Sequence, residues 1–117
     1  MKNLKIASII TFLVFGFNSA LAQQTKSKET IVIKTSTQCE MCKERVEKGM
    51  AYTKGVVLSN LNVEKAALTV VYKSHKTTPE KIRQAISEMG YDADGIKANP
   101  KAYRQLPHCC QKGGMEH

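Results

Sequence analysis

The sequence predicts an α+β fold in which a four-stranded antiparallel sheet carries two helices on one face. Residues 30–35 and 56–72 alternate apolar and polar side chains with the period of a strand, and a short polar turn divides the second segment into a hairpin. Apolar residues recur with helical spacing in residues 43–53 and 78–89. With a last short strand over residues 91–96, the order is βαββαβ, the ferredoxin-like split βαβ arrangement.

The first helix is expected to bury one face. Val46, Met50 and Thr53 recur at i, i+4 and i+7, so this face packs inward. A methionine at helical spacing is more often a core residue than a metal ligand, and Met50 is therefore assigned to the core. Gly55 ends the helical region because glycine tolerates a positive φ.

The second helix has clear start and stop signals. Thr78 is expected to be the N-cap and Pro79 the first helical residue. Gly90 ends the helix. The face predicted to be buried consists of Ile82, Ala85, Ile86 and Met89.

Cys39 and Cys42 stand three residues apart where the first strand gives way to the first helix. Cys39 would lie in the loop and Cys42 in the opening turn, where free backbone N–H groups and the helix dipole favour a thiolate. Such a pair can hold a soft metal ion or cycle between dithiol and disulfide. A purely structural disulfide would close so small a loop that it would constrain little of the unfolded chain.

Residues 1–22 have the pattern of a signal peptide. Lys2 and Lys5 precede an apolar run over residues 6–17, and Ala20 and Ala22 are the small residues that a signal peptidase reads. The run falls well short of the roughly 20 residues that span a bilayer. We therefore expect cleavage after Ala22 and a periplasmic or secreted protein, without stable membrane insertion.

The chain is small and basic. Its 117 residues carry a net charge of +8, and loss of the first 22 residues, which include two lysines, leaves 95 residues at +6. This length allows one domain, predicted over residues 30–97 after a mobile lead-in at residues 23–29. The charge suggests a partner with an acidic docking surface, but the basic residues are scattered and aromatics total 6%, which argues against nucleic-acid binding.

From about residue 30 to residue 96 the chain resembles the heavy-metal-associated domain. This domain occurs in small copper chaperones, in the N-terminal modules of metal-pumping ATPases and in the periplasmic mercury scavenger. Four motifs carry the resemblance, namely Cys39-Glu40-Met41-Cys42, Gly55-Val56, Thr78-Pro79-Glu80-Lys81-Ile82 and Gly90-Tyr91-Asp92-Ala93. The chain departs from the family at Ser36-Thr37-Gln38, where Gly-Met-Thr or Gly-Met-His is usual, and the missing Met predicts a looser or differently tuned loop.

The resemblance implies that Cys39 and Cys42 bind metal and that Tyr91 lies near the metal loop and shields it, although Tyr91 could equally be a plain core aromatic. Two thiolates suit soft ions, whereas Zn(II) prefers four ligands, so Cu(I) is the expected ion, with Hg(II) and Zn(II) as alternatives. An exposed two-ligand site can pass its ion to another thiolate. The expected partner is a metal-transporting membrane protein or another metal-binding domain.

Two other functions would use the same cysteines. A thioredoxin-like oxidoreductase also has a C-x-x-C pair that opens a helix, but it needs a further strand and helix before the motif. The mature chain would begin only about 16 residues before Cys39, so no enzyme is expected. The other alternative function is that of a regulatory or interaction domain whose cysteines are oxidised.

Residues 98–117 form a C-terminal tail outside the family pattern. Asn99 and Pro100 predict a short helix that ends near Pro107. His108, Cys109 and Cys110 follow as possible auxiliary metal ligands on a segment expected to be flexible. The alternative is a disordered end whose cysteines pair in a disulfide.

Overall fold

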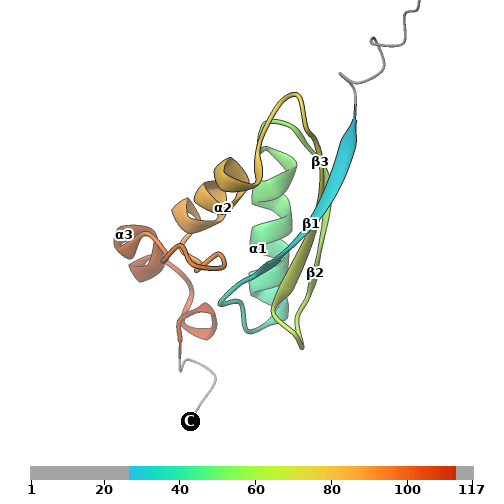
Figure 1. The fold of residues 1–117 in the computed structure, drawn as a ribbon. Helices are drawn as coiled ribbons and strands as arrows, with labels where there is room; N and C mark the ends of the chain where they lie inside the picture. The colour runs from blue at the N-terminus through green and yellow to red at the C-terminus, as the bar shows by residue number, and fades with distance from the viewer. Residues whose placement is uncertain (1–26, 113–117) are drawn as a thin grey trace, which may run out of the picture.

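A three-stranded antiparallel sheet in the order β1-β3-β2 forms one layer of the protein, and two helices lie against one face of it (Figure 1). The computed structural model describes residues 27–112, so the signal-peptide prediction lies outside the described residues. The elements are β1 (Lys28–Lys34), α1 (Glu40–Ala51), β2 (Val56–Asn62), β3 (Ala67–Lys73), α2 (Pro79–Glu88), α3 (Pro100–Arg104) and the 3₁₀ helix η3 (His108–Cys110). Within this described part, no helix is long and apolar enough to cross a bilayer.

The predicted hairpin of β2 and β3 is confirmed. The two strands pair in antiparallel register, with Leu61 opposite Leu68, and the turn between them places Ala66 at a φ of +52°. Alternate residues of β3 are buried, as the period of a strand requires. β1 begins at Lys28, inside the predicted lead-in, because its first residues extend the pairing with β3.

The two long helices pack their apolar stripes on this sheet. α1 begins at Glu40, earlier than predicted, because Cys39 is extended and its carbonyl accepts the first helical hydrogen bond. Thr78 caps α2 as predicted, with its hydroxyl accepting from the Lys81 N–H at 3.2 Å. The shared core includes Ile33, Val46, Met50, Leu61, Leu68, Val70, Tyr72, Ile82 and Ile86.

Residues 91–96 form a tight turn where a fourth strand was predicted. Ala93 makes only isolated bridges, to Thr35 and to Ile96, so the described sheet has three strands. Asp94 has a φ of +50°, and its N–H and carboxylate both bind the backbone of the last residue of β1. This left-handed residue reverses the chain before a second pair of strand residues can align.

The C-terminal segment is part of the fold through residue 112, which corrects the expectation of a flexible arm. Asn99 caps α3 as predicted, accepting from the N–H groups of Lys101 and Ala102. Leu106 and Cys110 are only 5% and 1% exposed and belong to the main core. Apolar burial therefore holds the segment in place.

We predict that Leu106→Ala lowers the free energy of unfolding by about 2–3 kcal/mol, because it removes buried methyl groups and leaves a cavity beside Gly90. Urea denaturation of the metal-free, reduced protein measures the change. The neighbouring exposed residue supplies the control, since Gln105→Ala should change stability by less than about 0.5 kcal/mol. Equal stability of the two variants would show that the segment is not docked in solution.

Candidate metal centre

Cys39 and Cys42 lie at the N-terminus of α1, as predicted. Cys39 is the N-cap, with extended backbone and no side-chain cap hydrogen bond, and Cys42 lies in the first turn. Their Sγ atoms are 3.2 Å apart. The backbone N–H of Gln38 donates to the Cys42 sulfur at 3.5 Å, so the loop adds a donor to those of the helix end.

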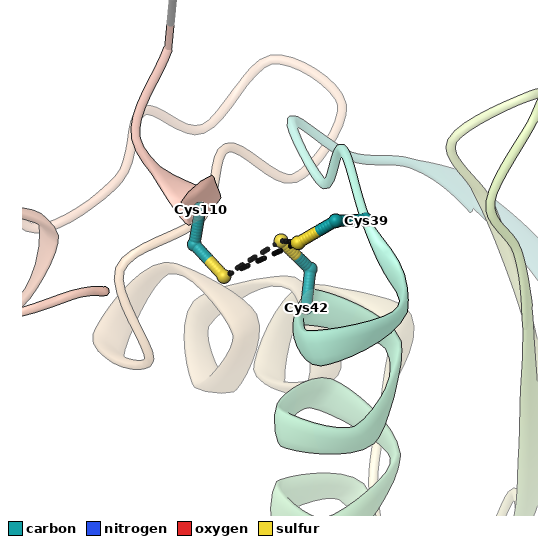
Figure 2. Close-up of side chains that lie close together, drawn as sticks. All are labelled: Cys39, Cys42 and Cys110. Carbon is teal, nitrogen blue, oxygen red and sulfur yellow. Dashed lines mark hydrogen bonds between the residues drawn. The ribbon is translucent and has the colours of Figure 1, made fainter. Parts of the chain in front are cut away.

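η3 brings a second pair of thiols to the same place. Cys110 Sγ lies 2.8 Å from Cys42 Sγ and 3.8 Å from Cys39 Sγ. Figure 2 shows the three side chains pointing toward one another, two from the start of α1 and one from η3. Their sulfurs all lie within 4.8 Å of one another, which is close enough to share one metal ion.

Cys109 joins the cluster from its exposed side. Its Sγ is 3.1 Å from Cys39 Sγ, and its thiol donates to the Met41 thioether at 3.9 Å. Cys42 and Cys110 are buried, whereas Cys39 and Cys109 are half-buried. His108 lies on the surface of η3 and is not part of the described three-residue group. All four cysteines are free thiols.

Gln38 ties the metal loop to the C-terminal segment. Its side-chain amide donates to the carbonyl oxygens of Cys109, at 3.3 Å, and Gln111, at 2.6 Å. Thr37 is buried beside it, and the Thr37 hydroxyl bonds that of Thr35 at 2.8 Å. The loop is therefore held from both sides, although the missing methionine predicted that it could be looser.

Tyr91 is fully buried next to the thiols, so it is both a core aromatic and a neighbour of the site. Burial raises the pKa of Tyr91, and the thiols of Cys110 and Cys42 add to the rise. Although the hydroxyl lies near these sulfurs, it makes no hydrogen bond of ordinary geometry within the described residues. A buried hydroxyl without a partner is costly, and a thiolate would be a good acceptor for it.

The thiols differ in how readily they ionise. Burial alone would raise the pKa of Cys39, but its contacts with the thiols of Cys109 and Cys42 outweigh this effect and lower the pKa to about 7. The contact with Cys39, followed by burial, raises the pKa of Cys109. Burial, followed by the neighbouring Cys42, raises the pKa of Cys110. Cys39 is thus the readiest nucleophile and soft ligand among these three.

The site is a sulfur cluster and not a cavity for an organic ligand. A hollow of about 460 Å³ between the helices is lined by other residues, including Arg45, Gly49, Met89 and Gln105. Sequence reasoning found the Cys39–Cys42 pair and named Cys109 and Cys110 as auxiliary candidates. It missed the contact of Met41 with Cys109 and the hydrogen bonds from Gln38 to the C-terminal segment. The thioether sulfur of Met41 and the departure from the family pattern at Gln38 were the features of the sequence that pointed to them.

Comparison with known proteins gives matches that agree with this chemistry. A family model described as "Heavy-metal-associated domain" matches residues 32–92. The copper chaperone CopZ of Staphylococcus epidermidis is 37% identical over 54 residues, which cover 46% of this chain and 79% of CopZ. Copper-transporting ATPase 1 of Rattus norvegicus is 32% identical over 71 residues, which cover 61% of this chain but only 5% of the ATPase.

A solved structure supports the fold independently. The crystal structure of oxidized MerP from Ralstonia metallidurans CH34 superposes with a TM-score of 0.56 at 22% identity, covering 58% of this chain and 96% of MerP. The family model ends at residue 92, so α3 and η3 lie beyond the matched region.

We predict that iodoacetamide alkylates Cys39 with an apparent pKa of about 7 in the reduced, metal-free protein. Only the thiolate reacts, and a lowered pKa means that the thiolate forms at lower pH, so the rate should rise through neutral pH and then level off. Peptide mass spectrometry at successive pH values measures the rate for each cysteine. Cys109 is the internal control because its pKa is raised, and a Cys39 midpoint near 9.0 would contradict the prediction.

Proposed function

The chain belongs to the heavy-metal-associated domain family, and on that premise we propose that it is an exported carrier of a soft metal ion, with Cu(I) as the ion. Cys39 and Cys42 are its proposed ligands. The observation that carries the proposal is their position, with sulfurs 3.2 Å apart at the start of α1.

The donor atoms favour a soft ion. Thiolates bind Cu(I) and Hg(II) well, whereas Mg(II) and Ca(II) prefer oxygen ligands. With a pKa lowered to about 7, Cys39 is about half deprotonated at pH 7, so an arriving ion displaces fewer protons than from an ordinary thiol. The relatives support copper over mercury, since one is named a copper chaperone and the other a copper-transporting ATPase.

Transfer to another protein follows from the exposure of the site. Cys39 is half-buried, so a thiolate of a partner can reach an ion that this cysteine holds. The proposed partner is a metal-transporting membrane protein or another metal-binding domain, in line with the match to an ATPase segment. The net charge of +6 that remains after loss of residues 1–22 suits an acidic docking surface on that partner.

We propose a carrier and not a thiol oxidoreductase. In a carrier the reduced pair is the binding state, and a Cys39–Cys42 disulfide would remove both ligands. Insulin reduction should therefore show negligible turnover, and oxidation should abolish metal uptake. Robust turnover in this assay without added metal would instead favour a thiol oxidoreductase.

We predict that the reduced protein binds one Cu(I) and that Cys39→Ser or Cys42→Ser weakens binding at least about 100-fold, because each removes a ligand worth several kcal/mol. Competition against a chromogenic Cu(I) chelator measures the affinity. Met50→Leu is the control, since Met50 is buried in the core and the swap conserves volume. Unchanged affinity in the Cys39→Ser, Cys42→Ser double variant would place the site elsewhere.

We predict that the signal peptide is removed during export and that the mature chain begins at Gln23. Intact mass spectrometry of protein from the periplasmic fraction of a bacterial host measures the cleavage position. The control is Leu13→Arg, which puts a charge in the apolar run and should leave the precursor uncleaved. Recovery of uncleaved wild-type chain in the cytoplasm would refute export.

A further inference from the structure

We infer that the metal ion is held by three thiolates, with Cys110 of η3 as the third ligand beside Cys39 and Cys42. This inference rests on the proposed function, since it describes the same site. It changes the character of the site, because a carrier with two ligands presents its ion openly, whereas three thiolates from two separate elements enclose it.

The sulfur positions favour three ligands. Taking about 2.3 Å for a metal–thiolate bond, three sulfurs around a trigonal ion stand about 4.0 Å apart, and two sulfurs on opposite sides of a linear ion stand about 4.6 Å apart. The three sulfurs of the site are separated by 2.8, 3.2 and 3.8 Å. The trigonal arrangement opens these three separations by about 1.2, 0.8 and 0.2 Å, whereas the linear one opens the Cys39–Cys42 pair by about 1.4 Å.

The third thiol is already in position without metal. Leu106 is buried ahead of η3, and Gln38 holds the carbonyl groups on either side of Cys110. The segment is closed by Lys112, whose amine binds Asp92 at 3.0 Å. The entropy of ordering η3 is thus lost on folding and not on metal binding, so the ligand gains affinity from preorganisation.

Tyr91 gives an independent observation. Its hydroxyl is fully buried, has no hydrogen-bond partner of ordinary geometry in the described chain, and lies near the thiols of Cys42 and Cys110. A neutral thiol is a weak acceptor, whereas a metal-bound thiolate carries negative charge and accepts well. The hydroxyl is therefore placed to donate its one hydrogen to a sulfur of this pair once that sulfur is deprotonated and bound to metal.

Cys109 is the contrasting thiol. It contacts Cys39 and Met41 at the exposed side, and it lies outside the three-sulfur group. Cys109 and Cys110 are adjacent in sequence, so Cys109→Ser is a matched control for Cys110→Ser. Cys110 is thus assigned as a metal ligand and Cys109 is not, although the sequence alone gave no reason to separate them.

The test uses Cu(I) and the reduced mature protein. X-ray absorption should count three sulfur neighbours in the wild type and in Cys109→Ser, but two in Cys110→Ser. Chelator competition should show a loss of at least about tenfold for Cys110→Ser and a smaller loss for Cys109→Ser, which removes only the contacts with Cys39 and Met41. Cys110→Ala serves as a second variant, and thermal unfolding of each metal-free variant checks the fold.

The outcomes separate this inference from the proposed function. Two sulfur neighbours in the wild type overturn it without any variant, even if Cys39 and Cys42 bind Cu(I). A loss on Cys109→Ser and none on Cys110→Ser also overturns it. Failure of the proposed function looks different, because the wild type would then bind no Cu(I), or would bind it equally after loss of Cys39 and Cys42.

Discussion

Burial of Leu106 in the main core is the contact on which the arrangement of the thiols depends. This side chain is the apolar anchor between α3 and η3, and full burial of a leucine contributes roughly 1.5–3 kcal/mol. The hydrogen bonds from Gln38 add net contributions of about 1 kcal/mol each and fix the direction of η3. Packing of Leu106 therefore holds the C-terminal segment on the core, and the side-chain amide of Gln38 fixes the position of η3 relative to the metal loop.

The pKa values of the cysteines limit the negative charge at the site when no metal is bound. A buried group of several thiolates without a cation would be strongly unfavourable, and the pKa values limit it, because that of Cys39 is lowered while those of Cys109 and Cys110 are raised. The Cys42 thiol donates to the Cys110 sulfur at 2.8 Å. In the proposed function a soft cation takes the place of the thiol protons, which makes metal affinity depend on pH.

Local patterns in the sequence were sufficient for most of the fold. The hairpin, the Thr78 and Asn99 caps and the buried stripes of both helices follow from residues within a few positions of one another. The prediction of a strand over residues 91–96 was wrong because Asp94, in the left-handed region, interrupts the extended backbone there. The contact of η3 with Cys42 joins residues 68 positions apart, and no local pattern encodes a contact at that separation.

The departure from the family pattern and the C-terminal segment are in direct contact through Gln38. Residues 36–38 lack the usual methionine, but Gln38 of this segment is the residue that binds η3. The family model ends at residue 92, before the element that carries Cys110. With ligands from two elements, an incoming thiolate can replace Cys110 while α1 still holds the ion. Exchange can therefore proceed one bond at a time, which reconciles an enclosed site with transfer.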